Sequence, residues 1–261
     1  LAEMGDKTQI ATIAMAAHYA SPLLVVIGTT LGMLIADVPA VFAGDMTKPE
    51  AAEQLVATAN EAFGSVDIVV NNAGYTWDGV AHKMTDEQFQ AMLDIHTIVP
   101  FRVARALAPH WREAAKAEAA EGREVFRKLI NVSSISGTMG NAGQVNYSAG
   151  KSAVVGMTKT LAKEWGQFKI NVNAVAFGFV ETRMTASKEA GVTVKGPDGE
   201  DIPQGIPDQM RAMAAMIIPL GRPATPEEAA GPVMFLASGL ADYVHGQVLN
   251  VTGGQFGGMY T

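Results

Sequence analysis

The sequence predicts an α/β fold built on a doubly wound parallel sheet. Short, almost wholly apolar runs, such as residues 66–70 and 170–176, alternate with longer segments whose apolar residues recur at helical spacing. Capping signatures of the Thr-x-x-Glu or Thr-x-x-Gln type mark where those helical segments begin. Strands that alternate with helices along a chain form parallel sheets with helices packed on them.

Composition limits the classes of function. A chain of 261 residues with 48% hydrophobic residues is long enough for one domain with a sizeable core. The net charge of -7 argues against a nucleic-acid surface. Cysteine is absent, which excludes disulfides, thiolate catalysis and zinc–thiolate sites, and is compatible with a reducing cytoplasm. We expect a cytoplasmic protein and predict no metal site.

Residues 1–43 differ from residues 44–261, and we predict two parts with this boundary. Asp37 is the only charged residue between Pro22 and Ala43, and about 20 mostly apolar residues can span a bilayer. Glu3 and Asp6 lie in a Glu-x-Gly-Asp-Lys-Thr motif that resembles small membrane cation/manganese exporters, in which the two carboxylates handle the metal. This resemblance implies membrane contact through residues 1–43, although a solvated terminus is the preferred interpretation of the two carboxylates.

Residues 41–74 predict a strand, a helix and a second strand. Val41 and Phe42 suit the first strand, and Thr47 with Glu50 forms a capping signature for the helix. Gly64 ends that helix, and residues 66–70 form a buried strand that runs into an Asn-Asn-Ala-Gly turn. The expected apolar stripe of the helix is Ala51, Leu55, Ala59, Ala62 and Phe63.

A second capping signature, from Thr85 to Gln88, begins the next helix. His96 lies on this helix and titrates near neutral pH. A lone helical histidine is more often packed or hydrogen-bonded than part of a proton relay, and both roles stay open. Residues 111–127 are charged and rich in alanine, which predicts a solvated helical extension. The apolar residues expected on the helix are Met92, Ile95, Val99 and Val103.

The chain is organised around residues 131–151. A strand that includes Leu129, Ile130 and Val132 precedes Ser134, which stands thirteen positions before Tyr147. Tyr147 and Lys151 are spaced i, i+4 and share one face of the following helix. A hydroxyl, a phenol and an ammonium therefore converge at the carboxyl end of a strand, where open α/β sheets bind ligands.

These three groups suit proton transfer to a carbonyl oxygen. A free phenol has a pKa near ~10, too high for ready exchange at neutral pH. We expect the Lys151 ammonium to lower the pKa of Tyr147, and a shift of about three units would take roughly 4 kcal/mol. Ser134 then holds the carbonyl oxygen while Tyr147 gives or takes the proton.

The remainder predicts two more strands, a loop region and a helix. Residues 170–176 form a strand after Gly166 ends the Tyr147 helix, and residues 246–251 form the last strand, before a Gly253-Gly254 turn. A third capping signature runs from Thr225 to Glu228. Residues 183–216 look too irregular for a core element. Their methionines either line an apolar pocket or pack ordinarily: Met184, Met210, Met213 and Met216.

The chain from roughly Ala43 to Gly254 resembles the short-chain dehydrogenases/reductases, most closely their 3-oxoacyl-(acyl-carrier-protein) reductase branch. The resemblance implies a Rossmann-like sheet, hydride transfer between a nicotinamide cofactor and a carbonyl or alcohol, and a substrate lid at residues 183–216. Ser134, Tyr147 and Lys151 match the catalytic residues. His96 stands where the family has an Asn that supports a relay water, and Phe177 replaces a Pro. The implied cofactor-binding residues are Asp45 at the adenine edge, Met46, Asn72, Ala73, Gly74, Tyr147, Lys151, Gly178, Val180 and Thr182.

The family's first βαβ unit, with its Thr-Gly-x-x-x-Gly-x-Gly loop, has no counterpart here. The nearest run, Gly28 to Gly32, has Leu34 in place of the last glycine, so we expect weakened cofactor binding. NAD and NADP stay open, and only the resemblance favours NADP. An atypical amino-terminal segment replaces this unit, through a fusion, a hybrid or an assembly error. Helices at residues 1–43 are favoured over a compressed βαβ unit that places residues 23–27 beside residues 66–70.

Three hypotheses for function stay open. The leading one is an NAD(P)-dependent oxidoreductase acting on a small carbonyl or alcohol, including a 3-oxoacyl thioester. The second is a catalytically impaired hybrid or a membrane-tethered fusion that carries an exporter fragment. The third is a catalytically dead oligomerisation module. The resemblance also implies a homodimer or homotetramer built on the helix after Thr85, the Tyr147 helix and the last strand.

Overall fold

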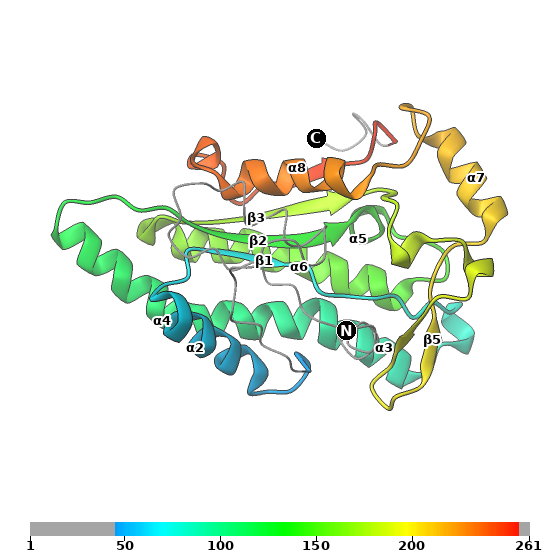
Figure 1. Ribbon diagram of the computed structural model, residues 1–261, viewed down its shortest axis with the longest axis horizontal. Coiled ribbons are helices and arrows are strands. Elements are labelled where there is room, and N and C mark those ends of the chain that lie inside the picture. The colour runs from blue at the N-terminus through cyan, green and yellow to red at the C-terminus, as the bar shows by residue number, and fades with distance from the viewer. Residues whose placement is uncertain (1–44, 256–261) are drawn as a thin grey trace.

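A computed structural model of the chain describes residues 45–255, and the predictions for residues 1–44 lie outside this range. Its centre is a parallel sheet with the strand order β1-β2-β3-β6 (Figure 1). The predicted α/β fold with a parallel sheet is therefore confirmed. The strands are β1 (Ile68–Asn71), β2 (Arg127–Ser134), β3 (Ile170–Phe177) and β6 (Val248–Val251).

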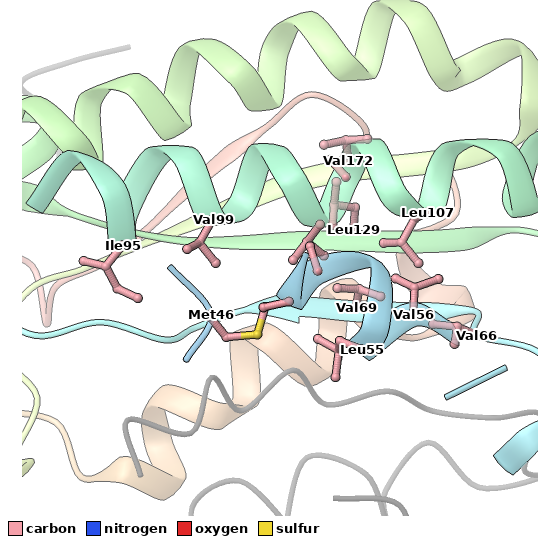
Figure 2. Packing of buried hydrophobic residues seen from close by; sticks show 14 of the residues in the cluster. Met46, Leu55, Val56, Val66, Val69, Ile95, Val99, Leu107, Leu129 and Val172 are labelled. Atoms are coloured by element: carbon pink, nitrogen blue, oxygen red, sulfur yellow. The ribbon is translucent and has the colours of Figure 1, made fainter. Parts of the chain in front are cut away.

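Helices cover both faces of the sheet because its central strands are apolar on both sides. Val69, Leu129 and Val172 face the helices α2, α4 and α6 in the main core (Figure 2). Val70 and Ile130 belong to a second core, on the side of helix α8. The long helices are α2 (Ala51–Phe63), α3 (Asp86–Leu93), α4 (Val99–Ala120), α6 (Val145–Trp165), α7 (Asp208–Ile217) and α8 (Pro226–Ala237).

The strand register sets the edge at which a site can form. Asn71 pairs with Asn131 between β1 and β2, and Ser134 pairs with Phe177 between β2 and β3. The carboxyl ends of these strands therefore meet at one edge of the sheet. The short helix α5 (Ile135–Met139) leaves β2 there. The hairpin of β4 (Thr193–Lys195) and β5 (Asp201–Pro203) and the helix α7 lie at the same end of the molecule (Figure 1).

Two of the three predicted capping boxes are confirmed, at Thr85 with Gln88 and at Thr225 with Glu228. The box at Thr47 was wrong: Glu50 is the N-cap of α2 and makes no side-chain capping bond. The Thr47 hydroxyl instead donates to the Asp45 carboxylate at 2.7 Å. Within α2, Ala62 is exposed, and the buried face is Ala51, Ala52, Leu55, Val56 and Ala59.

The solvated extension predicted for residues 111–127 was wrong at both ends. Trp111 is buried and its indole N–H donates to the Val66 carbonyl at 2.6 Å. Arg127 is the first residue of β2, and its guanidinium is buried beside Glu118 and Asp67. Sequence composition did not predict that these two residues are buried, because their hydrogen-bond and ion-pair partners lie in other elements of the fold.

The region predicted as an irregular lid contains ordered elements. It holds an antiparallel hairpin of β4 (Thr193–Lys195) and β5 (Asp201–Pro203), followed by α7. Ile202 of β5 is buried in the main core, so this region contributes to the core after all. Met210, Met213 and Met216 are 58%, 55% and 77% exposed, so they are not packed in the core. Their alternative role, lining an apolar pocket, stays a prediction. The shorter turns are Ala81–Lys83, Gly166–Phe168, Arg183–Thr185, Lys188–Ala190 and Gly239–Ala241.

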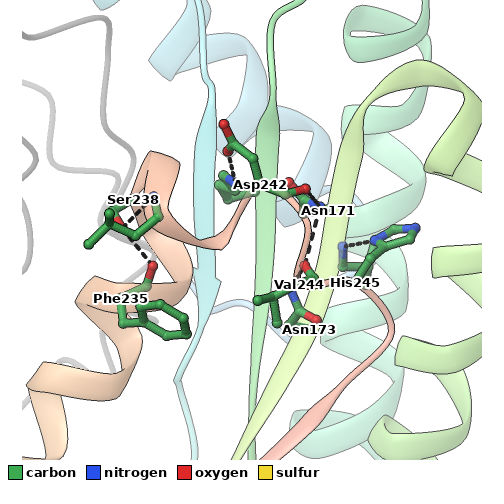
Figure 3. A network of polar contacts seen from close by, with 10 residues as sticks. Asn171, Asn173, Phe235, Ser238, Asp242, Val244 and His245 are labelled. Atoms are coloured by element: carbon green, nitrogen blue, oxygen red, sulfur yellow. Dashed lines mark hydrogen bonds and ion pairs between the residues drawn. The ribbon is translucent and has the colours of Figure 1, made fainter.

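At the amino end of β3, a polar network ties the sheet to the segment before β6 (Figure 3). The Asn171 side chain donates to the Asp242 carbonyl at 3.0 Å, and the Asn173 side chain donates to the Val244 carbonyl at 2.8 Å. The Val172 N–H donates to His245 Nδ1 at 3.2 Å. These bonds satisfy buried polar groups opposite the edge that carries the candidate site.

None of the helices between residues 45 and 255 combines the length and apolar character needed to cross a membrane.

Candidate active site

Ser134 is the last residue of β2 and the N-cap of α5. Its hydroxyl oxygen accepts from the Ser136 N–H at 3.1 Å, which fixes the side chain at the end of the strand. Its hydroxyl proton faces the Phe177 carbonyl at 3.5 Å, a long hydrogen bond. The proton is therefore held weakly and is available to another oxygen.

Tyr147 and Lys151 lie one turn apart on α6, as their spacing predicted, and both are buried. The Lys151 amine donates to the Val132 carbonyl at 2.7 Å and lies 5.7 Å from the centroid of the Tyr147 ring. Asn146 anchors this start of α6, because its side-chain oxygen accepts from the Tyr147 N–H at 2.8 Å. The structure thus brings the hydroxyl, the phenol and the amine together at the carboxyl end of β2.

Burial controls the protonation of this group. Burial raises the pKa of Tyr147 to about 12, an interaction with Ser134 opposes the rise, and Asp78 adds to it. Burial lowers the pKa of Lys151 to about 7. The prediction that Lys151 lowers the pKa of the phenol was wrong for this structure, because desolvation dominates and the amine is bonded to a backbone carbonyl. At neutral pH Tyr147 is therefore a protonated phenol, the form that donates a proton.

His96 lies in a π-helical turn, Asp94–Ile98, that joins α3 to α4. Its side chain is buried, and Nε2 lies 2.8 Å from the Tyr75 carbonyl, so Nε2 carries a proton and donates. Nδ1 is buried without a hydrogen-bond partner. Burial, with a smaller effect of Lys151, holds the pKa of His96 well below its usual value. A neutral, packed imidazole results, and a relay role stays a prediction.

The predicted cofactor residues follow the carboxyl ends of the strands. Asn72, Ala73 and Gly74 leave β1, and Gly178 follows β3 and donates from its N–H to the Val251 carbonyl at 2.9 Å. A Cβ at Gly178 would meet Thr252 Cα at 3.1 Å, so this close approach favours glycine. Asp45 and Thr182 are exposed, Val180 is buried, and Met46 is buried in the main core.

Sequence reasoning missed two buried amides beside the site, those of Asn146 and Gln204. The Asn146 side chain donates to the carbonyls of Trp77 and Gln88, both at 3.0 Å. The only signal for Asn146 was its position directly before Tyr147, and Gln204 carried none. Between residues 45 and 255 we find no group of three or more histidine, aspartate or glutamate side chains able to hold a metal ion.

Comparisons with known proteins agree with this geometry. A protein-family model described as enoyl-(acyl carrier protein) reductase matches residues 29–255. The chain is 36% identical to the 3-oxoacyl-[acyl-carrier-protein] reductase FabG of Vibrio cholerae, over 81% of this chain and 75% of that protein. It is 35% identical to FabG of Thermotoga maritima, over 80% and 74% of the two chains. An uncharacterized oxidoreductase of Mycobacterium tuberculosis is 38% identical, over 81% and 74%.

The resemblance of residues 1–43 to cation exporters gains no support from these comparisons. The family match begins at residue 29, inside that segment. The membrane contact predicted for the segment is likewise unsupported.

Proposed function

The chain belongs to the short-chain dehydrogenase/reductase family and is an oxidoreductase, and from this premise we propose that it reduces the carbonyl of a 3-oxoacyl thioester with NADPH or NADH. The observation that carries the proposal is the group formed by the half-buried Ser134 and the buried Tyr147 and Lys151 at the carboxyl ends of the parallel strands. The names of the FabG relatives support the substrate class.

The residues present fit a nicotinamide cofactor. A protonated Lys151 has three N–H groups, and the structure gives it one acceptor, the Val132 carbonyl. Its other N–H groups suit the hydroxyls of a ribose. When bound, the cofactor supplies the hydride. Tyr147 and Lys151 would hold its ribose, while Gly178, Val180 and Thr182 would hold the carboxamide and phosphates. Asn72, Ala73 and Gly74 would pass beneath it, with Asp45 and the Met46 backbone at the adenine.

The side chains then carry the proton chemistry. Ser134 donates its weakly held hydroxyl proton in a hydrogen bond to the substrate's carbonyl oxygen. As the carbonyl carbon gains a hydride, Tyr147 gives its phenolic proton to that oxygen, and the C=O bond becomes an alcohol. Solvent reprotonates the tyrosinate that is left. Proton transfer by a positioned side chain typically contributes about 10²–10⁴-fold.

His96 has a supporting role in this proposal. Its unpartnered Nδ1 is an acceptor beside Tyr147 and Lys151, which suits a bound water that passes protons to the site. A neutral imidazole keeps this acceptor available over the physiological pH range, because its pKa is held low.

We further propose a symmetric homodimer or homotetramer in the cytoplasm. Exposed apolar side chains near the last strand support self-association, among them Leu240, which is 83% exposed, and Leu249, which is 37% exposed. Light scattering above micromolar concentration checks this: a strictly monomeric particle contradicts it. No observation favours an exporter function or a membrane tether.

Cofactor titration followed by turnover tests the function. We expect calorimetry to detect NADPH or NADH binding, weaker than in a relative that has the complete glycine-rich loop. NADPH consumption with acetoacetyl thioester as substrate should yield the 3-hydroxyacyl thioester in equal amount. Absence of binding to either cofactor, together with absence of the alcohol product, would contradict the proposal.

A further inference from the structure

Three consecutive backbone carbonyls after β1 accept hydrogen bonds from three buried side chains. Tyr75 is bonded by His96 Nε2 at 2.8 Å, Thr76 by Gln204 Nε2 at 2.8 Å, and Trp77 by Asn146 Nδ2 at 3.0 Å. The donors come from the π-helical turn, from the segment after β5 and from the first turn of α6. One loop therefore connects the lid region to the catalytic helix.

The Gln204 side chain bonds both backbone polar groups of one loop residue, Thr76. Besides donating to the Thr76 carbonyl, its side-chain oxygen accepts from the Thr76 N–H at 3.3 Å and from the Thr76 hydroxyl at 3.4 Å. The Gln204 side chain is buried, at 2% exposure. A buried amide that pairs with both backbone groups of one residue fixes the position of that residue. Removing the amide would leave a buried N–H and a buried C=O without hydrogen-bond partners.

The backbone around Gln204 makes it the anchor of the lid hairpin. The Gln204 N–H donates to the Val192 carbonyl at 2.8 Å, which closes the hairpin. Gly205 follows with φ 103°, and a Cβ there would lie 2.7 Å from the Ala186 carbonyl oxygen. The chain therefore turns sharply at this point, and Gln204 is held against the core beside the buried Ile202.

The other two donors flank the catalytic tyrosine. The His96 ring packs edge to face on the Tyr147 ring, with centroids 4.9 Å apart. Asn146 accepts from the Tyr147 N–H at 2.8 Å. A shift of residues 75–77 would move both contacts, so the position of the lid hairpin and the position of Tyr147 are linked through this loop.

We infer that Gln204 is a positioning residue for carbonyl reduction: it docks the β4–β5 hairpin onto residues 75–77 and so fixes the position of the lid relative to Tyr147. The kinetic part of this inference rests on the proposed function. In the proposed reaction the docked lid lies over the substrate, so its loss should raise the KM of the carbonyl substrate. The binding of the cofactor should change less, because its predicted contacts at Asp45, Gly178 and Thr182 are outside both the hairpin and residues 75–77.

The test compares Gln204→Met, close in size but without the amide, with Asp201→Asn as the matched control. Asp201 bonds only Thr193 and Lys195 among the contacts shown within residues 45–255, so its loss perturbs the same hairpin without touching Thr76. With NADPH and acetoacetyl thioester, we expect Gln204→Met to raise KM at least fivefold while the Kd of NADPH changes less than twofold. Asp201→Asn should leave both the KM of the thioester and the Kd of NADPH unchanged.

Hydrogen exchange on the NADPH-bound protein gives a second readout that does not depend on turnover. Gln204→Met should speed exchange at least tenfold at the amides of residues 76 and 77 as well as in the hairpin, and Asp201→Asn should leave residues 76 and 77 unchanged. If Gln204→Met does not fold, Gln204→Glu is measured instead. It keeps the acceptor of the Thr76 N–H but loses the donor to the Thr76 carbonyl, and we expect the same rise in KM.

An unchanged KM, an equal rise in the control, or exchange that speeds up only in the hairpin would overturn the inference. If the parent protein fails to reduce the substrate, the proposed function fails, and exchange at residues 76 and 77 still decides whether Gln204 anchors the loop.

Discussion

The imidazole of His96 meets the ring of Tyr147 edge to face, with centroids 4.9 Å apart. Two glycines leave room for this packing. A Cβ at Gly74 would overlap His96 Cε1 and lie 2.9 Å from Nδ1, and a Cβ at Gly150 would lie 2.9 Å from His96 Cβ. His96 therefore occupies a slot that larger residues at these two positions would close.

The slot predicts a coupled effect of two substitutions. Gly74→Ala should lower the free energy of unfolding by roughly 1–3 kcal/mol, because its methyl group overpacks against the imidazole. His96→Ala removes that clash, so a double-mutant cycle by urea unfolding should give a coupling of about 0.5 kcal/mol or more. Gly156→Ala is the control: nothing lies within 4 Å of its Cβ position, and it should be neutral or stabilising. Equal destabilisation by Gly74→Ala with and without His96 would refute the slot.

The pKa of Lys151 predicts how stability depends on pH. Burial lowers this pKa to about 7 from 10.5, so between pH 7 and pH 10.5 the unfolded chain binds more protons than the fold. The contribution of Lys151 to the free energy of unfolding therefore rises with pH through this window, by up to about 1.4 kcal/mol per pH unit. Urea unfolding from pH 7 to pH 9.5 should show this slope in the parent protein and lose it in Lys151→Met. If the free energy of unfolding has the same pH dependence in the parent protein and in Lys151→Met, this prediction is contradicted.

Tyr147 contributes with the opposite sign at higher pH. Its pKa is raised to about 12 from 10.0, so above pH 10 the unfolded chain releases a proton that the fold keeps. Its contribution to stability is therefore present below pH 10 and falls as the pH rises toward 12. Restricting the Lys151 measurement to pH 9.5 and below keeps the two effects apart.

Arg127 predicts a large stability effect at the opposite end of the sheet. Its buried guanidinium donates to both Glu118 oxygens, at 2.9 and 2.7 Å, and lies 3.2 Å from the Asp67 carboxylate. Arg127→Met leaves two carboxylates without their cation, and breaking such a buried pair costs about 3–5 kcal/mol. Urea unfolding measures the loss.

Arg123→Met is the matched control, because this exposed guanidinium pairs with Glu121 at 2.7 Å at the surface. Its cost should stay within about 0–1 kcal/mol. Similar costs for the two variants would show that the Arg127 cluster adds no more than a surface ion pair.

Local sequence patterns predicted the elements whose causes are local. The spacing of Tyr147 and Lys151, the apolar strands and the capping boxes at Thr85 and Thr225 depend on neighbouring residues, and all are found. Thr47 misled because the helix begins later, with Glu50 as its N-cap. The Thr47 hydroxyl donates to the Asp45 carboxylate and caps no helix N–H.

Features that depend on distant partners were not predictable in this way. Gln204 and Thr76 are 128 positions apart, and Asn146 and Trp77 are 69 apart. Both pairs use backbone carbonyls, which every residue has, so no residue type marks them. The pKa of Tyr147 depends on burial, which follows only from the assembled fold.

The most direct test of the account is NADPH-dependent reduction of acetoacetyl thioester by Tyr147→Phe. The substitution removes the proton donor while the ring still packs on His96, so thermal unfolding should change little. We expect kcat/KM to fall by about 10²–10⁴-fold, while Tyr243→Phe, at a fully exposed tyrosine, keeps the activity of the parent protein. Full activity in Tyr147→Phe would contradict the claim that this phenol gives the proton to the substrate.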